Sequence, residues 1–362
     1  MFTAGKWADN ADLKPRIQAA LRRVSLSVEE VLALSPVVLQ KATGLSRDDV
    51  QSLQHKTRSC PAPTTASLLS DTPTLSSGCP VIDRLLGGGL PVGGVTELFG
   101  PSAVGKTQLA LQFCLSVQYP RQHGGLDSGA VYVSTEDVFP SKRLQQLISE
   151  QWVLRRDVPL SLREQTSFSD RVFVEHAADL PSLLTCLSRR LVLLLSRGLV
   201  RLVVVDSVAA LFRSEFEASD WLQRHQQLLA VSSALQRISR QFHTPVLCIN
   251  QVVDLMDQDK VLGPAPSSFG PALGLAWSNQ LTARLMIRRE AGLLTRGDQS
   301  SAPRSLQVTF APHLPSTGQS QGSVVVGVWR EGLRGEDQWE HRDMGQWEHR
   351  ADVGQSGGGE KA

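Results

Sequence analysis

Hydrophobic positions in the first sixty residues recur at the spacing of one face of an α-helix. Pro15 suits a first helical turn, and the apolar face that follows it is formed by Ile17, Ala20, Leu21 and Val24. A capping box that begins at Ser27 predicts the start of a second helix. Ser35 and Gly44 bracket a third helix, and Ser46 opens a fourth that carries Val50 and Leu53. We therefore predict a small all-α domain over residues 1–58.

The pattern changes beyond residue 58. Residues 59–77 hold three prolines among scattered Ser and Thr, which is typical of a linker. From residue 78 to residue 335, short β-branched runs alternate with helical segments, which predicts an α/β domain with a mainly parallel, doubly wound sheet. The clearest runs are Val95–Phe99, Ala130–Ser134, Leu202–Asp206 and Pro245–Ile249. Residues 336–362 repeat Gln-Trp-Glu-His-Arg and end in glycines, so we predict a disordered tail.

Composition restricts the class of protein. Hydrophobic residues make up 41% and charged residues 20% of the 362 residues, as in a soluble chain with a sizeable core. The net charge of +2 argues against a strongly basic nucleic-acid coat, so any nucleic-acid contact would be local. The five cysteines are odd in number and scattered, which favours reduced thiols in the cytosol or nucleus. The N-terminus has no signal-peptide pattern and no apolar run could span a bilayer, so no membrane partner is expected.

A phosphate-binding loop lies between the run Val95–Phe99 and the helical stretch Gln108–Val117. It reads G-x-x-x-x-G-K-T, and strand, loop and helix stand in the order that this motif requires. The glycines let successive backbone N–H groups point into one concavity, where the helix N-terminus favours phosphate oxygens. Lys106 is expected to reach the β- and γ-phosphates of ATP, and Thr107 to ligate Mg²⁺; the alternative is an ordinary glycine-rich turn. The predicted nucleotide-binding residues are Gly100, Pro101, Ser102, Ala103, Val104, Gly105, Lys106 and Thr107.

Three further strand ends carry candidate chemistry. One apolar run ends in Asp206, which we expect in the Mg²⁺ shell because a strand buried on both faces leaves its last residue beside the phosphates. Glu136 follows another run and is the candidate base for the attacking water. Gln251 follows a third, where an uncharged amide could sense the γ-phosphate. A simpler interpretation exists for each: a turn for Asp206 and Gln251, and a helix N-cap region for Glu136.

The order of these strand ends resembles that of the RecA-like recombinases, and the resemblance covers residues 78–315. Three stretches are similar to the recombinase paralogues of homologous recombination: Tyr119–Leu126, Asp206–Ala210 and Val246–Val252. The short helices of residues 1–58 resemble helix-hairpin-helix modules, which grip nucleic-acid backbone or partner proteins. The resemblance implies a RecA-like P-loop ATPase core preceded by a small helix-hairpin-helix-like domain.

The resemblance also implies roles for individual residues. Glu136 takes the role of the water-activating base, and Gln251 that of the γ-phosphate sensor. Arg143 matches a position that stacks near the adenine. Arg213 matches an arginine in the first of two DNA-facing loops, and the second loop would span about residues 252–270.

The chain departs from the active recombinases in five places. Its first loop, Phe212–Gln226, has two arginines against three carboxylates, and its second has three aspartates against one lysine, although phosphate neutralisation dominates nucleic-acid affinity. Residues 59–77 contain no Phe that could plug into a neighbouring core. Phe310 stands where the recombinases place an acidic residue in trans over the nucleotide, and Ala103 stands where they have Arg.

These departures favour an accessory subunit over a recombinase. We expect a weakly hydrolysing ATP-binding paralogue that forms a heterodimer with another RecA-like paralogue. The resemblance implies binding of single-stranded or branched DNA, such as Holliday junctions, and support of the main recombinase filament in double-strand-break repair. It also implies a nuclear location, with the cytoplasm and mitochondrion as further compartments.

Three alternatives stay open. The first is a DNA-stimulated ATPase that itself drives homologous pairing and strand exchange. The second is a nucleotide kinase or hexameric helicase on the same core, although the position of Glu136 and the helical N-terminal domain weigh against it. The third is a scaffold that does not use nucleotide, which would tolerate Lys106→Ala.

Overall fold

The computed structural model describes residues 15–24, 36–59, 73–136, 138–216, 220–254, 269–314 and 322–335. By its internal contacts the chain divides into two compact units, residues 1–72 and residues 73–362. The predicted helix at Ser27, the tail from residue 336 and residues 60–72 of the expected linker lie outside the described ranges. Within those ranges, no helix is both long and apolar enough to cross a membrane.

The first unit is helical in its described part. It contains α1 (Pro15–Val24), α3 (Pro36–Thr43) and α4 (Arg47–Ser59). The helix α4 begins after Ser46 because the Ser46 hydroxyl accepts a hydrogen bond from the backbone N–H of Asp49 at 3.2 Å. Asp49 also accepts a hydrogen bond from Arg16 at 2.5 Å, which ties α1 to α4. The buried apolar side chains come from all three helices: Ile17, Ala20, Leu39, Val50 and Leu53.

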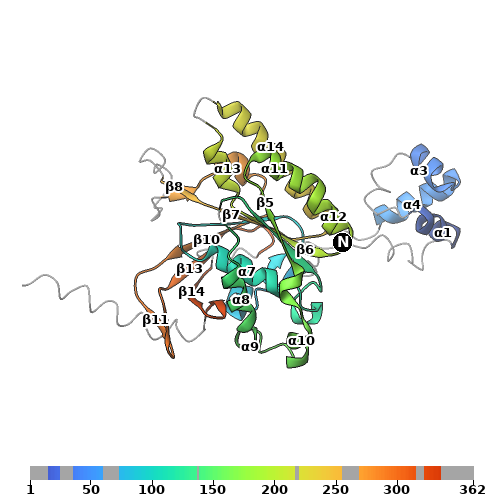
Figure 1. Cartoon of the computed structure of the whole chain (residues 1–362). Coiled ribbons are helices and arrows are strands. Elements are labelled where there is room, and N and C mark those ends of the chain that lie inside the picture. The colour runs from blue at the N-terminus through green and yellow to red at the C-terminus, as the bar shows by residue number, and fades with distance from the viewer. Residues whose placement is uncertain are drawn as a thin grey trace, which may run out of the picture. The chain divides into compact units, whose positions relative to one another are not determined.

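A nine-stranded sheet forms the centre of the second unit (Figure 1). Adjacent strands from β10 to β5 pair in parallel, and β13, β14 and β15 extend the sheet with antiparallel pairs. The predicted mainly parallel sheet is therefore confirmed. In spatial order the strands are β15 (Gly332–Arg334), β14 (Ser323–Trp329), β13 (Arg304–Phe310), β10 (Ala283–Arg289), β3 (Val95–Phe99), β7 (Val246–Asn250), β6 (Val200–Asp206), β4 (Gly129–Ser134) and β5 (Val172–His176).

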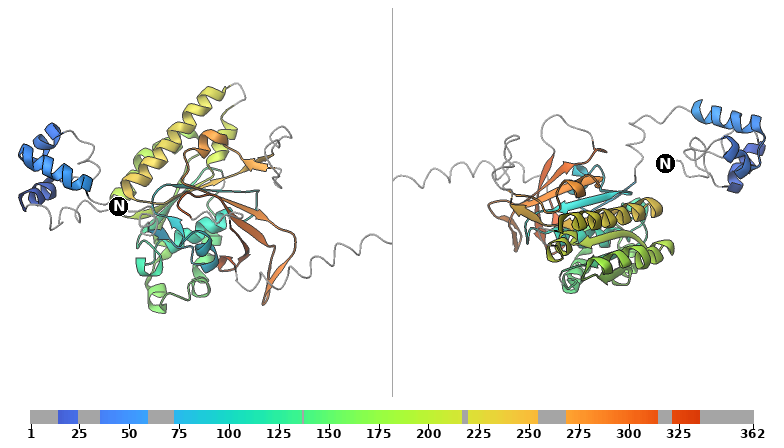
Figure 2. Two further views of the ribbon diagram at one scale, coloured as in Figure 1. Left: turned by 180° about the vertical axis from the view of Figure 1, so that it is seen from behind. Right: turned by 90° about the horizontal axis from the view of Figure 1, so that it is seen from above.

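Helices cover both faces of this sheet. Consecutive residues of the central strands are apolar and point to opposite faces, so both faces have to be buried. In β6, Leu202 and Val204 belong to one core cluster, and Val203 and Val205 belong to the other. The first cluster packs under α6 (Pro80–Leu85), α7 (Lys106–Ser116) and α8 (Ser141–Ser149). The second packs under α11 (Leu180–Thr185), α12 (Leu191–Ser196), α13 (Val208–Ser214), α14 (Trp221–Phe242) and α15 (Gly274–Ser278), several of which face the viewer in the right panel of Figure 2.

Short elements complete the second unit. A π-helical stretch at Cys186–Arg190 joins α11 to α12, and 3-10 turns lie at Arg121–His123 and Phe168–Arg171. The remaining helices are α9 (Gln151–Leu154) and α10 (Leu160–Gln165). In the described part of the chain, three two-stranded ladders stand apart from the main sheet: β1 (Thr74–Leu75) with β2 (Leu90–Pro91), β8 (Val252–Asp254) with β9 (Phe269–Pro271), and β11 (Leu294–Arg296) with β12 (Gln299–Ser301).

The boundary between linker and core differs in one detail from the sequence pattern. Strand β1 lies within residues 59–77, and it pairs with β2 of the second unit. Ser77 is fully buried and its hydroxyl donates a hydrogen bond to Asp83 at 2.7 Å. Proline and serine content gave no sign of this pairing, because the two residues of β1 are held by tertiary contacts.

Candidate nucleotide-binding site

The carboxyl ends of four central strands lie next to one another at one edge of the sheet. In the strand register Phe99 pairs with Asn250, and Ser134 pairs with Asp206. The residues that follow β3, β4, β6 and β7 are therefore neighbours, although up to about 150 residues of chain separate them. This edge holds most of the predicted site residues.

The phosphate-binding loop Gly100–Gly105 connects β3 to α7. Gly100 is required for close approach, because a Cβ atom there would lie 2.0 Å from the carbonyl oxygen of Ile287. Gly105 has φ 108° and occupies the N-cap of α7, a left-handed conformation that favours glycine. Ala103 also has a positive φ, 58°. Helix α7 thus begins at Lys106, two residues before the predicted start at Gln108.

Lys106 is folded over the loop. Its ammonium group donates hydrogen bonds to the carbonyl oxygens of Gly100 at 2.7 Å and Pro101 at 2.6 Å. Burial lowers the pKa of Lys106, and the nearby carboxylates Asp206 and Glu136 oppose that shift. A triphosphate in the loop would offer the ammonium group anionic oxygens in place of these neutral carbonyls.

Asp206 receives two hydroxyl donors on the same oxygen. Thr107 Oγ1 donates to Asp206 Oδ2 at 2.9 Å, and Tyr132 donates a short hydrogen bond to the same atom. Burial raises the pKa of Asp206, although both hydroxyls and Lys106 lower it. The peptide bond that follows Asp206 is cis, and the backbone N–H of Ser207 donates to Thr135 Oγ1 at 2.8 Å. A hydroxyl and a carboxylate that converge in this way are hard oxygen donors, which fit Mg²⁺.

Glu136 lies between the two other predicted polar residues. Gln251 Nε2 donates to Glu136 Oε2 at 2.7 Å, and Arg213 Nη2 lies 3.0 Å from Glu136 Oε1. The Ser207 hydroxyl makes a longer contact, 3.5 Å, with Oε2. Both carboxylate oxygens therefore have donors, which come from segments more than seventy residues away in sequence. The structure brings Glu136, Gln251 and Arg213 together, while their chemical roles stay predictions.

Arg143 lies at the flank of the loop, on α8. It donates to Gln108 Oε1 on α7 at 2.5 Å and to the carbonyl oxygen of Trp329 at 2.6 Å. A third bond reaches the carbonyl oxygen of Arg330 at 3.1 Å. Arg143 thus connects two helices to the β14–β15 turn beside the phosphate-binding loop. Its stacking on adenine stays a prediction.

Sequence reasoning missed Tyr132 and Asn250 as members of the site. Tyr132 lies in an apolar strand, and its only signal was a hydroxyl at a buried position. Asn250 is the last residue of β7 and directly precedes Gln251. Its amide nitrogen donates to Glu97 Oε1 at 2.5 Å, and its oxygen accepts from the backbone N–H of Gln251 at 2.8 Å. Local spacing predicts neither the bond of Tyr132 to Asp206 nor the bond of Asn250 to Glu97.

The structure describes the surroundings of two departures from the recombinase pattern, Ala103 and Phe310. The carbonyl oxygen of Ala103 receives a long contact, 3.4 Å, from Arg289 Nη2, so a cation reaches the loop from β10. Phe310 is 47% exposed. Residues 217–219 and 255–268, which include three of the six acidic groups noted in the two loops, lie outside the described residues.

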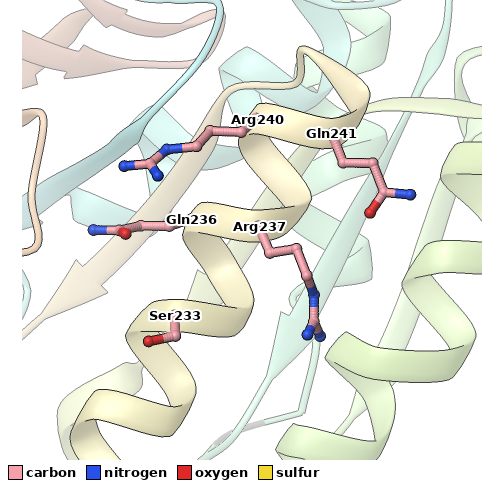
Figure 3. Close-up of a pocket in the computed structure, with 5 residues that line it drawn as sticks. All are labelled: Ser233, Gln236, Arg237, Arg240 and Gln241. Atoms are coloured by element: carbon pink, nitrogen blue, oxygen red, sulfur yellow. The ribbon is translucent and has the colours of Figure 1, made fainter. Parts of the chain in front are cut away.

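Two surface hollows can be compared with this site. One lies on the C-terminal half of α14 and is lined by Ser233, Gln236, Arg237, Arg240 and Gln241, which project from the helix in Figure 3. None of these is a predicted site residue. The other is lined by Thr135, Glu136, Ala178, Ala210, Leu211, Arg213 and Ser214, so it opens directly beside the Glu136–Arg213 pair.

Comparisons with protein families match both units. A Rad51 model matches residues 70–319, and a model described as the XRCC3/RpoA-like, helix-hairpin-helix domain matches residues 8–57. The first match alone covers more than half of the chain.

Several curated proteins are similar over nearly the whole chain. DNA repair protein XRCC3 of Mus musculus is 48% identical over 344 residues, covering 90% of this chain and 97% of that protein. DNA repair protein XRCC3 of Bos taurus is 49% identical over 337 residues, covering 88% and 96%. DNA repair protein RAD51 homolog 2 of Homo sapiens is 29% identical over 342 residues, covering 86% and 84%.

Proposed function

Because the chain belongs to the Rad51 family, we propose that it is an ATP-binding accessory subunit in the homologous-recombination repair of DNA double-strand breaks. It works in a heterodimer with another RecA-like paralogue, in the nucleus. It binds single-stranded or branched DNA and supports the main recombinase filament. The relatives are named DNA repair proteins, which supports the process, and the heterodimer and the DNA structure are our extension.

One observation carries the nucleotide part of the proposal. Lys106, Thr107 and Asp206 meet at the same sheet edge as Glu136 and Gln251. The loop N–H groups and Lys106 would hold the phosphates of ATP, and the oxygens of Thr107 and Asp206 would hold Mg²⁺. Bound Mg²⁺ would neutralise charge on the phosphate oxygens. Glu136 would orient the attacking water, and its hydrogen bond with Gln251, away from the core, supports this role.

Three features support an accessory rather than a self-sufficient role. The sequence of the linker offers no Phe for a neighbouring core. The position where recombinases carry an acidic residue in trans is the exposed Phe310. The first loop is acidic on balance. The first feature weakens self-assembly, the second ATP turnover and the third DNA binding by a single chain, and a partner subunit could supply what is missing.

The direct test combines purification and nucleotide analysis. The full chain is isolated from cells, alone and with its associated proteins, and bound nucleotide is extracted and identified. We expect ATP or ADP together with a second RecA-like protein, and Lys106→Ala should remove most of the nucleotide. Lys142→Ala is the control, because Lys142 is an exposed lysine on α8. A nucleotide-free protein, or a long ATP-dependent filament of this chain alone that performs strand exchange, would contradict the proposal.

A second candidate is a DNA-stimulated ATPase that drives pairing itself. The observation in its favour is the presence of both Glu136 and Gln251 at hydrogen-bond distance, the residue types needed to orient water and sense phosphate. Steady-state phosphate release with and without single-stranded DNA distinguishes the two. A large DNA-stimulated rate that Glu136→Gln abolishes would favour this second candidate.

A further inference from the structure

A fully buried carboxylate lies just before the phosphate-binding loop, and the nucleotide chemistry does not use it. Glu97 on β3 has no exposed surface. Its Oε1 accepts from Asn250 Nδ2 at 2.5 Å and from Trp277 Nε1 at 2.8 Å. Its Oε2 accepts from Arg284 Nε at 2.5 Å. Glu97 therefore joins four elements, β3, β7, α15 and β10.

Stability alone is a weak reason for such an arrangement. Moving a carboxylate and a guanidinium out of water costs several kcal/mol, and a well-packed apolar pair of similar volume is often at least as stable. What a buried charge does provide is a defined geometry for its hydrogen-bond partners. The informative question is which partner needs that geometry.

Asn250 is the partner whose orientation matters. Its amide nitrogen faces Glu97, so its oxygen must face the other way, where it accepts from the backbone N–H of Gln251 at 2.8 Å. The reversed amide would direct its oxygen at a carboxylate, which can only accept hydrogen bonds. Glu97 thereby selects one of the two orientations of the Asn250 side chain.

Gln251 connects this buried group to the nucleotide edge and to a surface ladder. Its side chain reaches Glu136 at 2.7 Å, and its carbonyl oxygen accepts from the backbone N–H of Ala272 at 3.0 Å. The ladder of β8 and β9 starts at the next residue (Figure 1), and α15, which carries Trp277, follows β9. Glu97 thus contacts Asn250, the residue before Gln251, and α15, the helix after the ladder.

We propose that Asn250, oriented by Glu97, is the positioning residue that fixes how Gln251 reaches the γ-phosphate position. The inference rests on the proposed nucleotide binding. Asn250 touches no nucleotide itself. It fixes the backbone from which Gln251 reaches the site, so the loss of Asn250 should have the same effect on ligand recognition as the loss of Gln251.

The test measures discrimination between a nonhydrolysable ATP analogue, AMPPNP, and ADP, both with Mg²⁺. Calorimetric dissociation constants are determined for the full chain, for Asn250→Ala, for Gln251→Ala and for the double variant. We expect each single variant to lower the AMPPNP preference by about tenfold, as for loss of one hydrogen bond to a charged group. The double variant should lower it no further, because the two residues act in series.

Ser239→Ala is the matched control. Ser239 is also fully buried and polar, and it bonds Gly94 and Thr244, which precede the same two strands at their opposite ends. This variant should lose stability and keep its AMPPNP preference. If Asn250→Ala does not fold, Asn250→Ser replaces it, since a serine hydroxyl is too short to reach both partners.

Amide hydrogen exchange gives a second measurement. AMPPNP should slow exchange across residues 252–271 in the unmodified chain more than ADP does, and Asn250→Ala should remove this difference. A variant that keeps both the preference and the exchange difference, or single effects that add in the double variant, would overturn the inference. Absence of nucleotide binding or of any AMPPNP preference in the unmodified chain would instead refute the proposed function on which it rests.

Discussion

At the scale of single residues, the carboxylates in and next to the site differ in the donors from which they accept hydrogen bonds. Asp206 receives two hydroxyls, Glu97 three donors from the core, and Glu136 a guanidinium and an amide. The first two carboxylates are largely or fully buried, while Glu136 is 38% exposed. Solvent therefore competes most readily for the partners of Glu136, which makes it the carboxylate whose bonds are easiest to change.

The Glu136–Arg213 pair leads to a prediction on activity. Arg213 is 55% exposed, so Arg213→Gln should change the free energy of unfolding by no more than about 1 kcal/mol. The same change removes the cation that competes with water for the Glu136 carboxylate, and we expect DNA-independent ATP hydrolysis to rise. Steady-state phosphate release is the measurement, with Arg224→Gln, which replaces an arginine near the start of α14, as control. A lower rate in Arg213→Gln would show that the guanidinium assists hydrolysis instead.

His313 gives a prediction on pH. It is half-buried after β13, and within the described chain its Nδ1 is buried without a hydrogen-bond partner. Burial lowers the pKa of His313 from its ordinary value of 6.5. The unfolded chain therefore binds a proton more readily than the folded chain, so stability should fall as pH drops below about 6.5.

His313→Gln tests this directly, because glutamine does not titrate. Urea midpoints measured between pH 7.5 and pH 5 should fall less in His313→Gln than in the unmodified chain. His225→Gln, at an exposed position on α14, is the control for the replacement of a histidine by glutamine. Parallel curves for the unmodified chain and His313→Gln would contradict the assignment.

At the scale of elements, the phosphate-binding loop depends on contacts with a strand far along the chain. Residue Gly100 lies against the backbone of Ile287 in β10, the parallel neighbour of β3. The same neighbour carries Arg284, which bonds Glu97, and Arg289, which approaches Ala103. The position of the loop is therefore a property of the β3–β10 pair and not of the motif alone.

Substitutions of two glycines near β3 distinguish the effect of close packing from the effect of backbone strain. In Gly100→Ala the new Cβ would meet a backbone oxygen at 2.0 Å, so we expect a loss of about 3 kcal/mol in unfolding free energy and more than tenfold weaker nucleotide binding. Gly93 has φ 113° and open space around it. Gly93→Ala should therefore cost about 1 kcal/mol of strain and leave nucleotide affinity unchanged. Denaturant unfolding and nucleotide titration of both variants make the comparison, and equal nucleotide affinities would contradict it.

At the scale of the whole molecule, the balance of charge limits how nucleic acid can be bound. The chain carries a net charge of +2, and its two candidate DNA-facing loops offer two arginines and one lysine among six carboxylates. Strong binding to phosphates by these loops alone would need more cations. This is the physical basis for expecting contributions from a partner subunit.

The salt dependence of DNA binding tests this limit. Three cations neutralise at most three phosphates, so a plot of log affinity against log salt for single-stranded DNA should have a slope of about −2. Fluorescence anisotropy between 50 and 200 mM salt would measure it, and the same titration with the co-purified partner should be steeper. A slope of about −5 or beyond for this chain alone would mean that other cations bind the DNA.

The sequence by itself determined the local chemistry of this protein. The motif at Gly100–Thr107, the apolar runs that became β3, β4, β6 and β7, and the helical first domain all depend on neighbours within a few residues, and they were predictable for that reason. Asp206, Glu136 and Gln251 could be nominated because each follows a recognisable strand.

Only the tertiary structure decided which of these groups touch. Strand order places β3 between β7 and β10, and this order alone brings Asn250 and Arg284 to Glu97, across more than 150 residues of chain. The hydroxyl of Tyr132 on Asp206 and the bond from Arg143 to Trp329 have the same origin. Local periodicity reports which face of a strand is buried but contains no information about its neighbours in the sheet, so these contacts were settled by how the strands pair.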